Sequence, residues 1–264
     1  MITNLSNMMV ERLTAFRQGN NGKLPERILV YRDGVSEVRF IQIKLNSRPD
    51  KVLQGQFNIV VSEELPAIKA SFRKFHTAQR QYDPKLTIVI CGKRHHTRFY
   101  PTDAAHADRD GNPRPGTVVD RGVTAVYEFD FFLQGSFVRL SGPTSILIDD
   151  VNLLAHGGLQ GTTRPTHYYV VYDEIKFKSD ELQGLTNSVS YMFARATKAV
   201  SLVSPAYYAD LACERGRCYL HRLLQGIGSS ATTSTSNDDQ VKQEATRMWQ
   251  GGVSASLKST MFYL

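Results

Sequence analysis

Three short apolar runs, spaced along the chain and separated by helical patterns, constrain the fold more than any other feature. Residues 28–31 (ILVY) and 86–91 (LTIVIC) predict buried strands, and residues 166–174 (THYYVVYDE) predict one more strand. Strand-like runs also occur at 117–119 and 126–133. Strands that alternate with helices predict an α/β fold in which helices flank a sheet.

Four segments are predicted to be helical, over residues near 2–17, 63–80, 179–196 and 205–223. The third has the strongest signals, because Ser179 is a candidate N-cap and two acidic residues in the first turn favour the helix dipole. Its apolar face is predicted to consist of Leu182, Leu185, Val189, Met192 and Ala196. Residues 226–240 are rich in serine and threonine and predict a flexible loop.

Composition limits the class of protein. The chain has 264 residues, 41% of them hydrophobic, so a sizeable core and a single large domain are expected. Its net charge of +7 suits an anionic partner, either nucleic acid or a membrane surface. A basic soluble protein with no such partner is an equally compatible interpretation of the charge alone.

The cysteines are few and unpaired in spacing. Cys91, Cys213 and Cys218 are odd in number and lack the CxxC pattern of zinc sites, so neither a disulfide framework nor a structural zinc is expected. This usage predicts an intracellular, cytoplasmic protein. The opening residues are amphipathic and charged, unlike a signal peptide, and no run of about 18 apolar residues occurs, so no membrane-spanning segment is expected.

Two of the predicted strands lead directly into polar or charged residues that could form a ligand site. The run at 28–31 closes on Asp33 and Gly34, which would place a carboxylate at the C-terminal end of a buried strand. Ligand sites in α/β folds lie outside such strand ends. An aspartate before glycine is also typical of a turn, and the residues alone favour that simpler interpretation. The run at 86–91 leads into the basic segment KRHHTR at 93–98.

Five strings occur in order along the chain: PERILVYRDGVSE, KRHHTRFYP, PGTVVDRGVT with YEFDFF, HGGLQGTTRPTHYYVVYDE and SPAYYADLACERGR. Together they resemble the C-terminal part of the Piwi domain of Argonaute proteins, of fungal type. The resemblance covers residues 1 to about 222 and implies an RNase H-like mixed sheet flanked by helices. It also implies a small guide RNA held with its 5′ end at the junction with a preceding Mid domain, and metal-dependent cleavage of a complementary target RNA.

The resemblance assigns two acidic residues to the family's catalytic site. Asp33 matches the third catalytic position and Asp210 the fourth, so both are candidate metal ligands, although Asp210 alone would be taken for a solvated helix residue. Two divalent ions, Mg²⁺ or Mn²⁺, would clamp the attacking and leaving oxygens of a phosphoryl displacement, and hard cations prefer oxygen ligands. The family's first two catalytic acids would fall before Met1, so we expect an N-terminally truncated domain. Little or no cleavage is expected from this polypeptide alone, since the cofactor requires upstream residues.

The resemblance also places nine residues along the guide backbone: Lys93, Arg94, His96, His156, Arg164, Arg195, Ser201, Tyr207 and Arg215. Cationic, imidazole and hydroxyl groups of this kind bind phosphates without reading sequence. Lys93 and Arg215 are expected nearest the guide 5′ end. The simpler alternatives are an exposed charged loop at 93–96, where His95 and His96 would point opposite ways on a strand, and a solvated helix face for Arg195.

Two segments depart from the family pattern, at 38–54 and 135–154. Val38-Arg39 can be encoded by GTGAGA and Leu53-Gln54 can end in CAG, which are the terminal signatures of a spliceosomal intron. The second segment permits the same interpretation, and its removal would restore a single alanine and the sequence EFDFFLQAHGG. We hypothesise that both are retained introns, and the alternative is that they are genuine surface loops.

Three functional hypotheses follow from the sequence. The first is an Argonaute fragment that binds guide RNA and contributes Asp33 and Asp210 to a cleavage site completed in a longer protein. The second is a non-catalytic guide-binding or interaction module, and the third is an RNase H-type nuclease acting on DNA. The ordered motifs RPTHY and AYYAD argue against the third.

Overall fold

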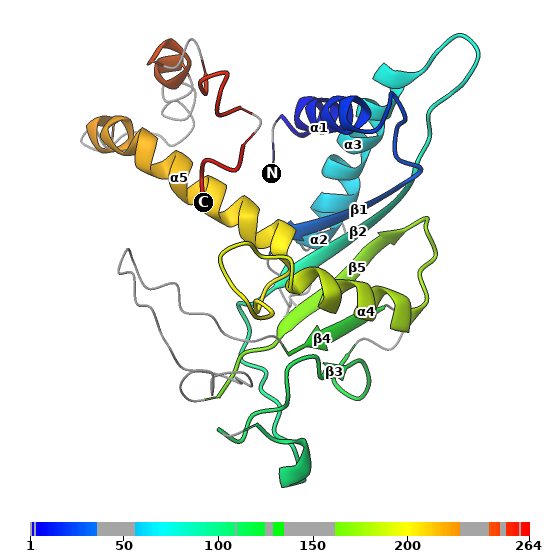
Figure 1. Cartoon of the computed structure of the whole chain (residues 1–264), viewed down its shortest axis with the longest axis vertical. Coiled ribbons are helices and arrows are strands. Elements are labelled where there is room, and N and C mark those ends of the chain that lie inside the picture. The colour runs from blue at the N-terminus through cyan, green and yellow to red at the C-terminus, as the bar shows by residue number, and fades with distance from the viewer. Residues whose placement is uncertain are drawn as a thin grey trace, which may run out of the picture. The chain divides into compact units, whose positions relative to one another are not determined.

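The fold is taken from a computed structural model, which describes residues 2, 4–35, 56–108, 110–124, 129–134, 162–227, 243–248, 252–258 and 260–264. The chain divides into two compact units, Met1–Ser204 and Pro205–Leu264 (Figure 1). Each unit is described by itself. The segments 38–54 and 135–154, and residues 228–240 of the predicted flexible loop, lie outside the described residues.

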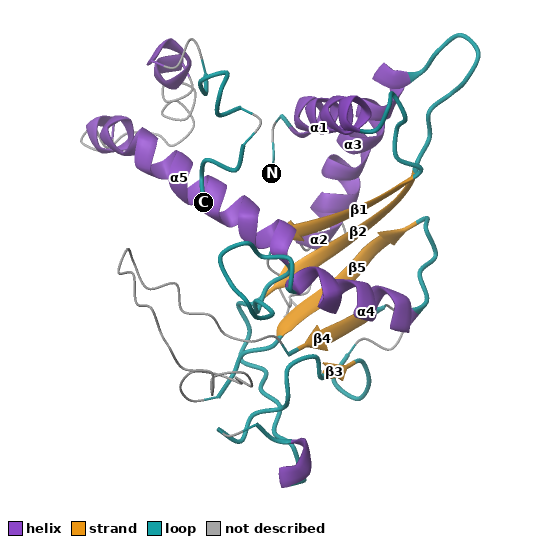
Figure 2. Ribbon diagram, in the orientation of Figure 1, coloured by secondary structure: helices purple, strands orange, loops and turns teal. Residues whose placement is uncertain are grey.

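The first unit contains a five-stranded mixed sheet, which confirms the predicted α/β class (Figure 2). Its strands are β1 (Arg27–Asp33), β2 (Lys85–Gly92), β3 (Val118–Val119), β4 (Asp130–Leu133) and β5 (Thr166–Asp173). They lie in the order β1-β2-β5-β4-β3. Strands β1 and β2 are parallel, and every other neighbouring pair is antiparallel. The C-terminal ends of β1 and β2 therefore meet the N-terminal end of β5 at one edge of the sheet.

One face of the sheet is covered by the N-terminal helices. These are α1 (Leu5–Gly19), α2 (Gln56–Ile59), the π-helical segment η1 (Val60–Glu64), α3 (Leu65–Phe72) and the 3₁₀ segment η2 (Arg73–Phe75). Their buried side chains form one apolar core with those of β2: Leu13, Val60, Ile68, Phe72, Leu86, Ile88 and Ile90. Burial of this apolar surface is the main force that holds the layer together.

The opposite face of the sheet is covered by α4 (Ser179–Ser190) (Figure 1). Leu182 of this helix is fully buried, and a hydrogen bond of 2.9 Å joins Thr186 Oγ1 to the hydroxyl of Tyr31 on β1. Because successive strand residues point to opposite faces, Tyr31 faces α4 while Val30 packs against the helices of the other layer. The sheet is thus the middle of three layers.

The structure corrects two helix predictions. The predicted helix 63–80 begins earlier, at Gln56, and ends at Phe75, because the next residue is extended and residues 77 and 80 form a turn through reciprocal backbone hydrogen bonds. The predicted helix 179–196 ends at Ser190, and Lys178 rather than Ser179 is its N-cap. The backbone amide of that lysine donates to Glu181 Oε2 at 3.2 Å, so the acid in the first turn caps the helix.

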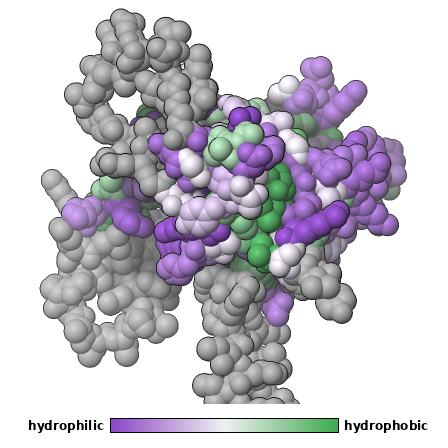
Figure 3. Space-filling model, turned by 90° about the horizontal axis from the view of Figure 1, so that it is seen from below, coloured by the Kyte–Doolittle hydropathy of each residue, from purple (hydrophilic) through white to green (hydrophobic). Residues whose placement is uncertain are grey.

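The buried face of α4 also differs from the predicted one. Leu185 is 39% exposed and Met192, beyond the helix end, is 70% exposed, whereas the polar residues Gln183 and Thr186 are buried. Burial of polar side chains is possible here because each has a partner: Gln183 Nε2 donates to Asp120 Oδ2 at 3.0 Å and Thr186 bonds Tyr31. Figure 3 shows one face of the molecule, on which a hydrophobic strip is bordered by hydrophilic side chains.

The second unit begins within α5 (Ser204–Ile227), which confirms the predicted helix 205–223 and extends it. A short helix follows at 243–248, and turns occur over residues 255–258 and 260–263. None of the helices in the described part of the chain is both long enough and apolar enough to cross a bilayer.

Candidate nucleic-acid and metal site

Three elements deliver candidate site residues to one edge of the sheet. Asp33 is the last residue of β1, Lys93 directly follows β2, and Arg164 lies two residues before β5. Strand pairing sets their proximity, since Asp33 is opposite Cys91 and Gly92 is opposite His167. A carboxylate and two basic residues therefore lie at the same edge, outside the strand ends.

A hydrogen-bonded group connects Lys93, Arg164 and Ser201. The Lys93 ammonium donates to the hydroxyl of Ser201, and the carbonyl of Ser201 accepts from the hydroxyl of Thr166 at the start of β5. The Arg164 guanidinium donates to the Lys93 carbonyl at 3.4 Å. Three residues predicted to contact a guide backbone, from three distant parts of the sequence, are thus brought together.

The electrostatics of this group depend on the position of Lys93. Burial, and to a smaller extent the positive charge of Arg164, lower the pKa of Lys93 to about 8, although the negative charge of Asp33 opposes the shift. A lysine held at this pKa loses its proton easily unless an anion is present. A bound phosphate would therefore stabilise the charged form of Lys93 in this basic group.

Asp33 sits in a tight turn at the tip of β1. Its Oδ1 accepts a hydrogen bond of 2.7 Å from the backbone amide of Gly34, whose φ of +77° favours glycine. The turn role suggested by the sequence is therefore present alongside the half-buried strand-end position. Within the described residues, no three His, Cys, Asp or Glu side chains are grouped so as to hold a metal ion. Asp33 therefore supplies one carboxylate at this strand end, and a divalent-metal site there would need further acids.

The remaining predicted site residues lie in different parts of the chain. Arg94, His96 and Arg195 belong to the first unit and are exposed, while His156 lies outside the described residues. Tyr207, Asp210 and Arg215 lie along α5 in the second unit, so their proximity to Lys93 and Asp33 stays a prediction.

The structure agrees with one of the two simpler alternatives for these residues and contradicts the other. Residues 93–100 form a loop, as the first alternative has it for 93–96, so alternation of the two histidines at 95 and 96 on a strand does not apply. His95 is half-buried instead, with Nε2 2.9 Å from the Pro165 carbonyl oxygen and its ring edge-on to Phe132. Arg195 follows the end of α4 and lies in a turn, so it is not part of a helix face.

Sequence reasoning missed two polar side-chain pairs beside this edge. Arg32 and the buried Glu64 form an ion pair with a 2.9 Å contact, directly before Asp33. His167 Nε2 lies 2.5 Å from Oδ2 of the buried Asp130, and the His167 ring stacks on Phe132 with centroids 4.2 Å apart. One sequence signal could have pointed to Glu64. It lies four residues after Val60 and four before Ile68, at a position where an apolar side chain is expected. No comparable signal marks Asp130.

Comparison with known proteins agrees along most of the chain. A family model described as the Piwi domain matches residues 1–49, 50–150 and 134–221. Argonaute 5 of Arabidopsis thaliana is 37% identical over 262 residues, which cover 98% of this chain and 22% of that protein. The C-terminal lobe of a budding yeast Argonaute is 35% identical with a TM-score of 0.66, covering 90% of this chain and 42% of that one. The Kluyveromyces polysporus Argonaute solved with a guide RNA is 36% identical with a TM-score of 0.66, covering 89% of this chain and 23% of that one.

The mixed sheet, its flanking helices and the basic edge define an RNase H-like α/β domain, the fold of the solved Argonaute lobes. The chain belongs to the Piwi domain family. It spans about a fifth of the length of the curated relatives that it matches, 22% for the Arabidopsis protein and 20% for the rice protein MEL1.

Proposed function

We propose that this chain is the guide-binding Piwi domain of an Argonaute protein, which holds the backbone of a small guide RNA. The observation that carries the proposal is the group formed by Lys93, Arg164 and Ser201 at the edge of the sheet. Ammonium, guanidinium and hydroxyl donors in one place can bind consecutive phosphates without reading base sequence. A relative that is 36% identical was solved with a guide RNA, which supports the same ligand here.

The proposal extends to the other residues matched by the family motifs. Further contacts with the guide backbone are assigned to Arg94, His96, His156, Arg195, Tyr207 and Arg215. The guide 5′ end would lie at a junction with a Mid domain in the complete protein, and a complementary target RNA would pair with the guide. This arrangement would serve gene silencing by small RNAs.

Cleavage of the target is proposed for the complete protein. Asp33 and Asp210 would each supply carboxylate oxygens to Mg²⁺ or Mn²⁺, together with further acids of the complete protein. When bound, the metal ions would stabilise charge on the attacking and leaving oxygens of the phosphodiester. Asp33 is suited to this role because it sits at a strand end, where its turn holds the carboxylate in place. The second candidate is a guide-binding domain without cleavage, in which the basic group acts alone.

Substitution of Lys93 tests guide binding. In the complete polypeptide encoded by the transcript, Lys93→Met should weaken binding of a 5′-phosphorylated guide RNA by about 10- to 100-fold, because a charge-assisted hydrogen bond contributes about 1.5–3 kcal/mol. The slope of log affinity against log salt should also fall by about one. Both are measured by filter binding over a salt series. The matched control is Lys85→Met, since Lys85 is exposed at the opposite end of β2.

The same lysine predicts a pH dependence. With the pKa of free Lys93 at about 8, the side chain is charged below pH 8 and loses its proton above it, whereas a bound phosphate raises that pKa. Guide affinity should therefore be flat below pH 8 and fall by about tenfold towards pH 9. The Lys93→Met protein should lack this step. Equal affinity, salt slope and pH profile in both proteins would contradict the role of Lys93.

We also propose that segments 38–54 and 135–154 are retained introns. The family match is divided between residues 49 and 50, within the first segment, and two matches overlap over 134–150, within the second, as inserted sequence would cause. Amplification and sequencing of the mature transcript should give products that lack both segments. Reads that continue through both segments in mature, polyadenylated transcripts would show instead that they are translated loops.

A further inference from the structure

The charged pair formed by Arg32 and Glu64 lies where the fold otherwise places apolar side chains. On β1, the alternate residues Ile28 and Val30 pack in the core beneath α1 and α3, and Arg32 continues the same row. Arg32 is 20% exposed and Glu64 only 3%. A buried arginine requires a partner with good geometry, because its desolvation is costly.

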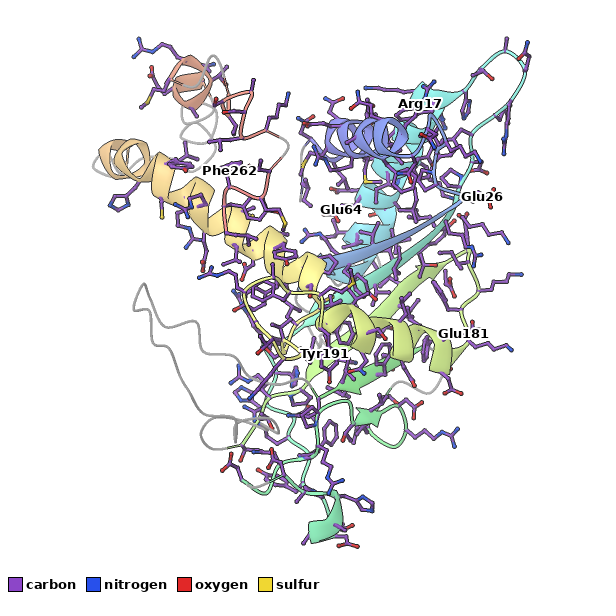
Figure 4. The ribbon with its side chains drawn as sticks, in the orientation of Figure 1. Arg17, Glu26, Glu64, Glu181, Tyr191 and Phe262 are labelled. Atoms are coloured by element: carbon purple, nitrogen blue, oxygen red, sulfur yellow. The ribbon has the colours of Figure 1, made fainter. Side chains whose placement is uncertain are left out.

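The π-helical segment explains how an acid reaches this arginine. Buried residues along η1 and α3 recur every four positions, at Val60, Glu64, Ile68 and Phe72. An ordinary α-helix turns once every 3.6 residues, so a strict four-residue row drifts around it, and the wider π turn at Val60–Glu64 offsets that drift. Glu64 is thereby held on the face that looks towards β1 (Figure 4).

The contact between the two side chains is bidentate. Arg32 Nε donates to Glu64 Oε2 at 2.9 Å, and Arg32 Nη2 donates to Glu64 Oε1 at 3.0 Å. The third guanidinium nitrogen, Nη1, donates to the backbone carbonyl of Asp33. The rigid planar guanidinium of Arg32 therefore connects the buried Glu64 carboxylate in the helical layer to the backbone of Asp33, the candidate metal ligand.

From this chain of contacts we propose that Glu64 and Arg32 are positioning residues for Asp33. Glu64 holds the guanidinium, the guanidinium holds the Asp33 carbonyl, and the Gly34 amide bonds to the Asp33 carboxylate at 2.7 Å. The carboxylate orientation at the strand tip is thus set from the helical layer behind it. Glu64 itself points into the protein, so it acts through Arg32 and does not contact the metal or RNA. The expected effect on cleavage rests on the proposed function, whereas the positioning of Asp33 does not.

The test is Glu64→Gln in the complete polypeptide, with guide RNA, target RNA and Mg²⁺. Target cleavage should slow by about 10- to 100-fold and need more Mg²⁺ for half-maximal rate, as when a residue that orients a metal ligand is removed. Guide affinity should be unchanged. Hydrogen exchange at the Gly34 amide should become several-fold faster, which reports on the turn independently of activity. The control is Glu174→Gln, which alters the Lys69–Glu174 ion pair of 2.7 Å at the other end of β2 and should change none of these readouts.

A double variant, Arg32→Met with Glu64→Met, separates positioning from stability. An apolar pair of similar volume can replace a buried ion pair with little loss of stability. This variant should therefore fold while keeping the cleavage defect and the faster Gly34 exchange. Wild-type cleavage in the double variant, or unchanged Gly34 exchange in Glu64→Gln, would overturn the proposal. If the unsubstituted protein does not cleave, the proposed function fails, and Gly34 exchange alone then decides whether Glu64 positions Asp33.

Discussion

Substitution of Asp33 by asparagine is expected to abolish target cleavage by the complete polypeptide and to leave guide binding intact. Asparagine keeps the shape of the side chain, and its Oδ1 can still accept the 2.7 Å hydrogen bond from Gly34. It removes the negative charge that a divalent cation needs. Because a bound metal stabilises the transition state by several kcal/mol, a loss of about 10³-fold or more in single-turnover rate is expected.

The matched control for this substitution is Asp83→Asn, which makes the same chemical change at an exposed residue two positions before β2, at the far end of the sheet. Asp83→Asn should cleave at the normal rate. Asp210→Asn should reproduce the defect of Asp33→Asn, because both residues are proposed to share one metal cluster. Normal cleavage by either Asp33→Asn or Asp210→Asn would contradict that cluster. An unsubstituted protein that binds guide RNA but cannot cleave would favour the non-catalytic domain.

Substitution of Tyr168 by alanine is expected to cause the largest loss of stability. Tyr168 of β5 is 1% exposed, stacks on Phe131 with ring centroids 5.2 Å apart, and meets Tyr31 edge-on at 6.3 Å. Its hydroxyl accepts a hydrogen bond of 3.1 Å from the backbone amide of Val203. Truncating a buried aromatic residue costs about 3–5 kcal/mol, a large share of the 5–15 kcal/mol that stabilises a typical domain.

The loss should appear as a lower urea midpoint in pulse proteolysis of the Piwi domain within the complete polypeptide. Tyr168→Phe keeps the ring but leaves the buried Val203 amide without its acceptor, so a smaller cost of about 1–3 kcal/mol is expected. Guide binding should weaken in Tyr168→Phe, because this hydrogen bond anchors the segment that carries Ser201. Tyr191→Ala is the control, since Tyr191 is 52% exposed and should cost less than about 0.5 kcal/mol. Equal midpoints for the two alanine variants would contradict the packing role of Tyr168.

The strands were predicted well because each carries a local signal. The apolar runs at 28–31 and 86–91 lie within β1 and β2, and the run at 166–174 extends one residue beyond β5. The helix predictions were less accurate at their ends and faces. Leu185 has an apolar side chain at a suitable spacing but remains exposed, while Thr186 is buried because Tyr31 on another element satisfies its hydroxyl. Spacing alone cannot reveal a partner of this kind.

In the candidate site, too, local sequence signals indicated some residues but not the partners of others. The family resemblance proposed Lys93, Arg164 and Ser201 as guide contacts without a structure, and two of them, Lys93 and Arg164, lie in distinctive short strings. The motifs do not indicate that Glu64 is the partner of Arg32. Neighbouring residues do not explain an acid within a helical row of apolar residues, because its partner lies on another element.

By itself, the amino-acid sequence determined the alternation of strands and helices, the family and the residue types offered to a phosphate or a metal. These properties follow from periodicity and motifs within short segments, which any local reading can recover. Only the tertiary structure decided which of those residues meet. Lys93 and Ser201 are 108 positions apart, and their contact exists because strand pairing brings the end of β2 to the start of β5. Contacts of that kind depend on the register between strands and on long-range packing, which no segment encodes alone.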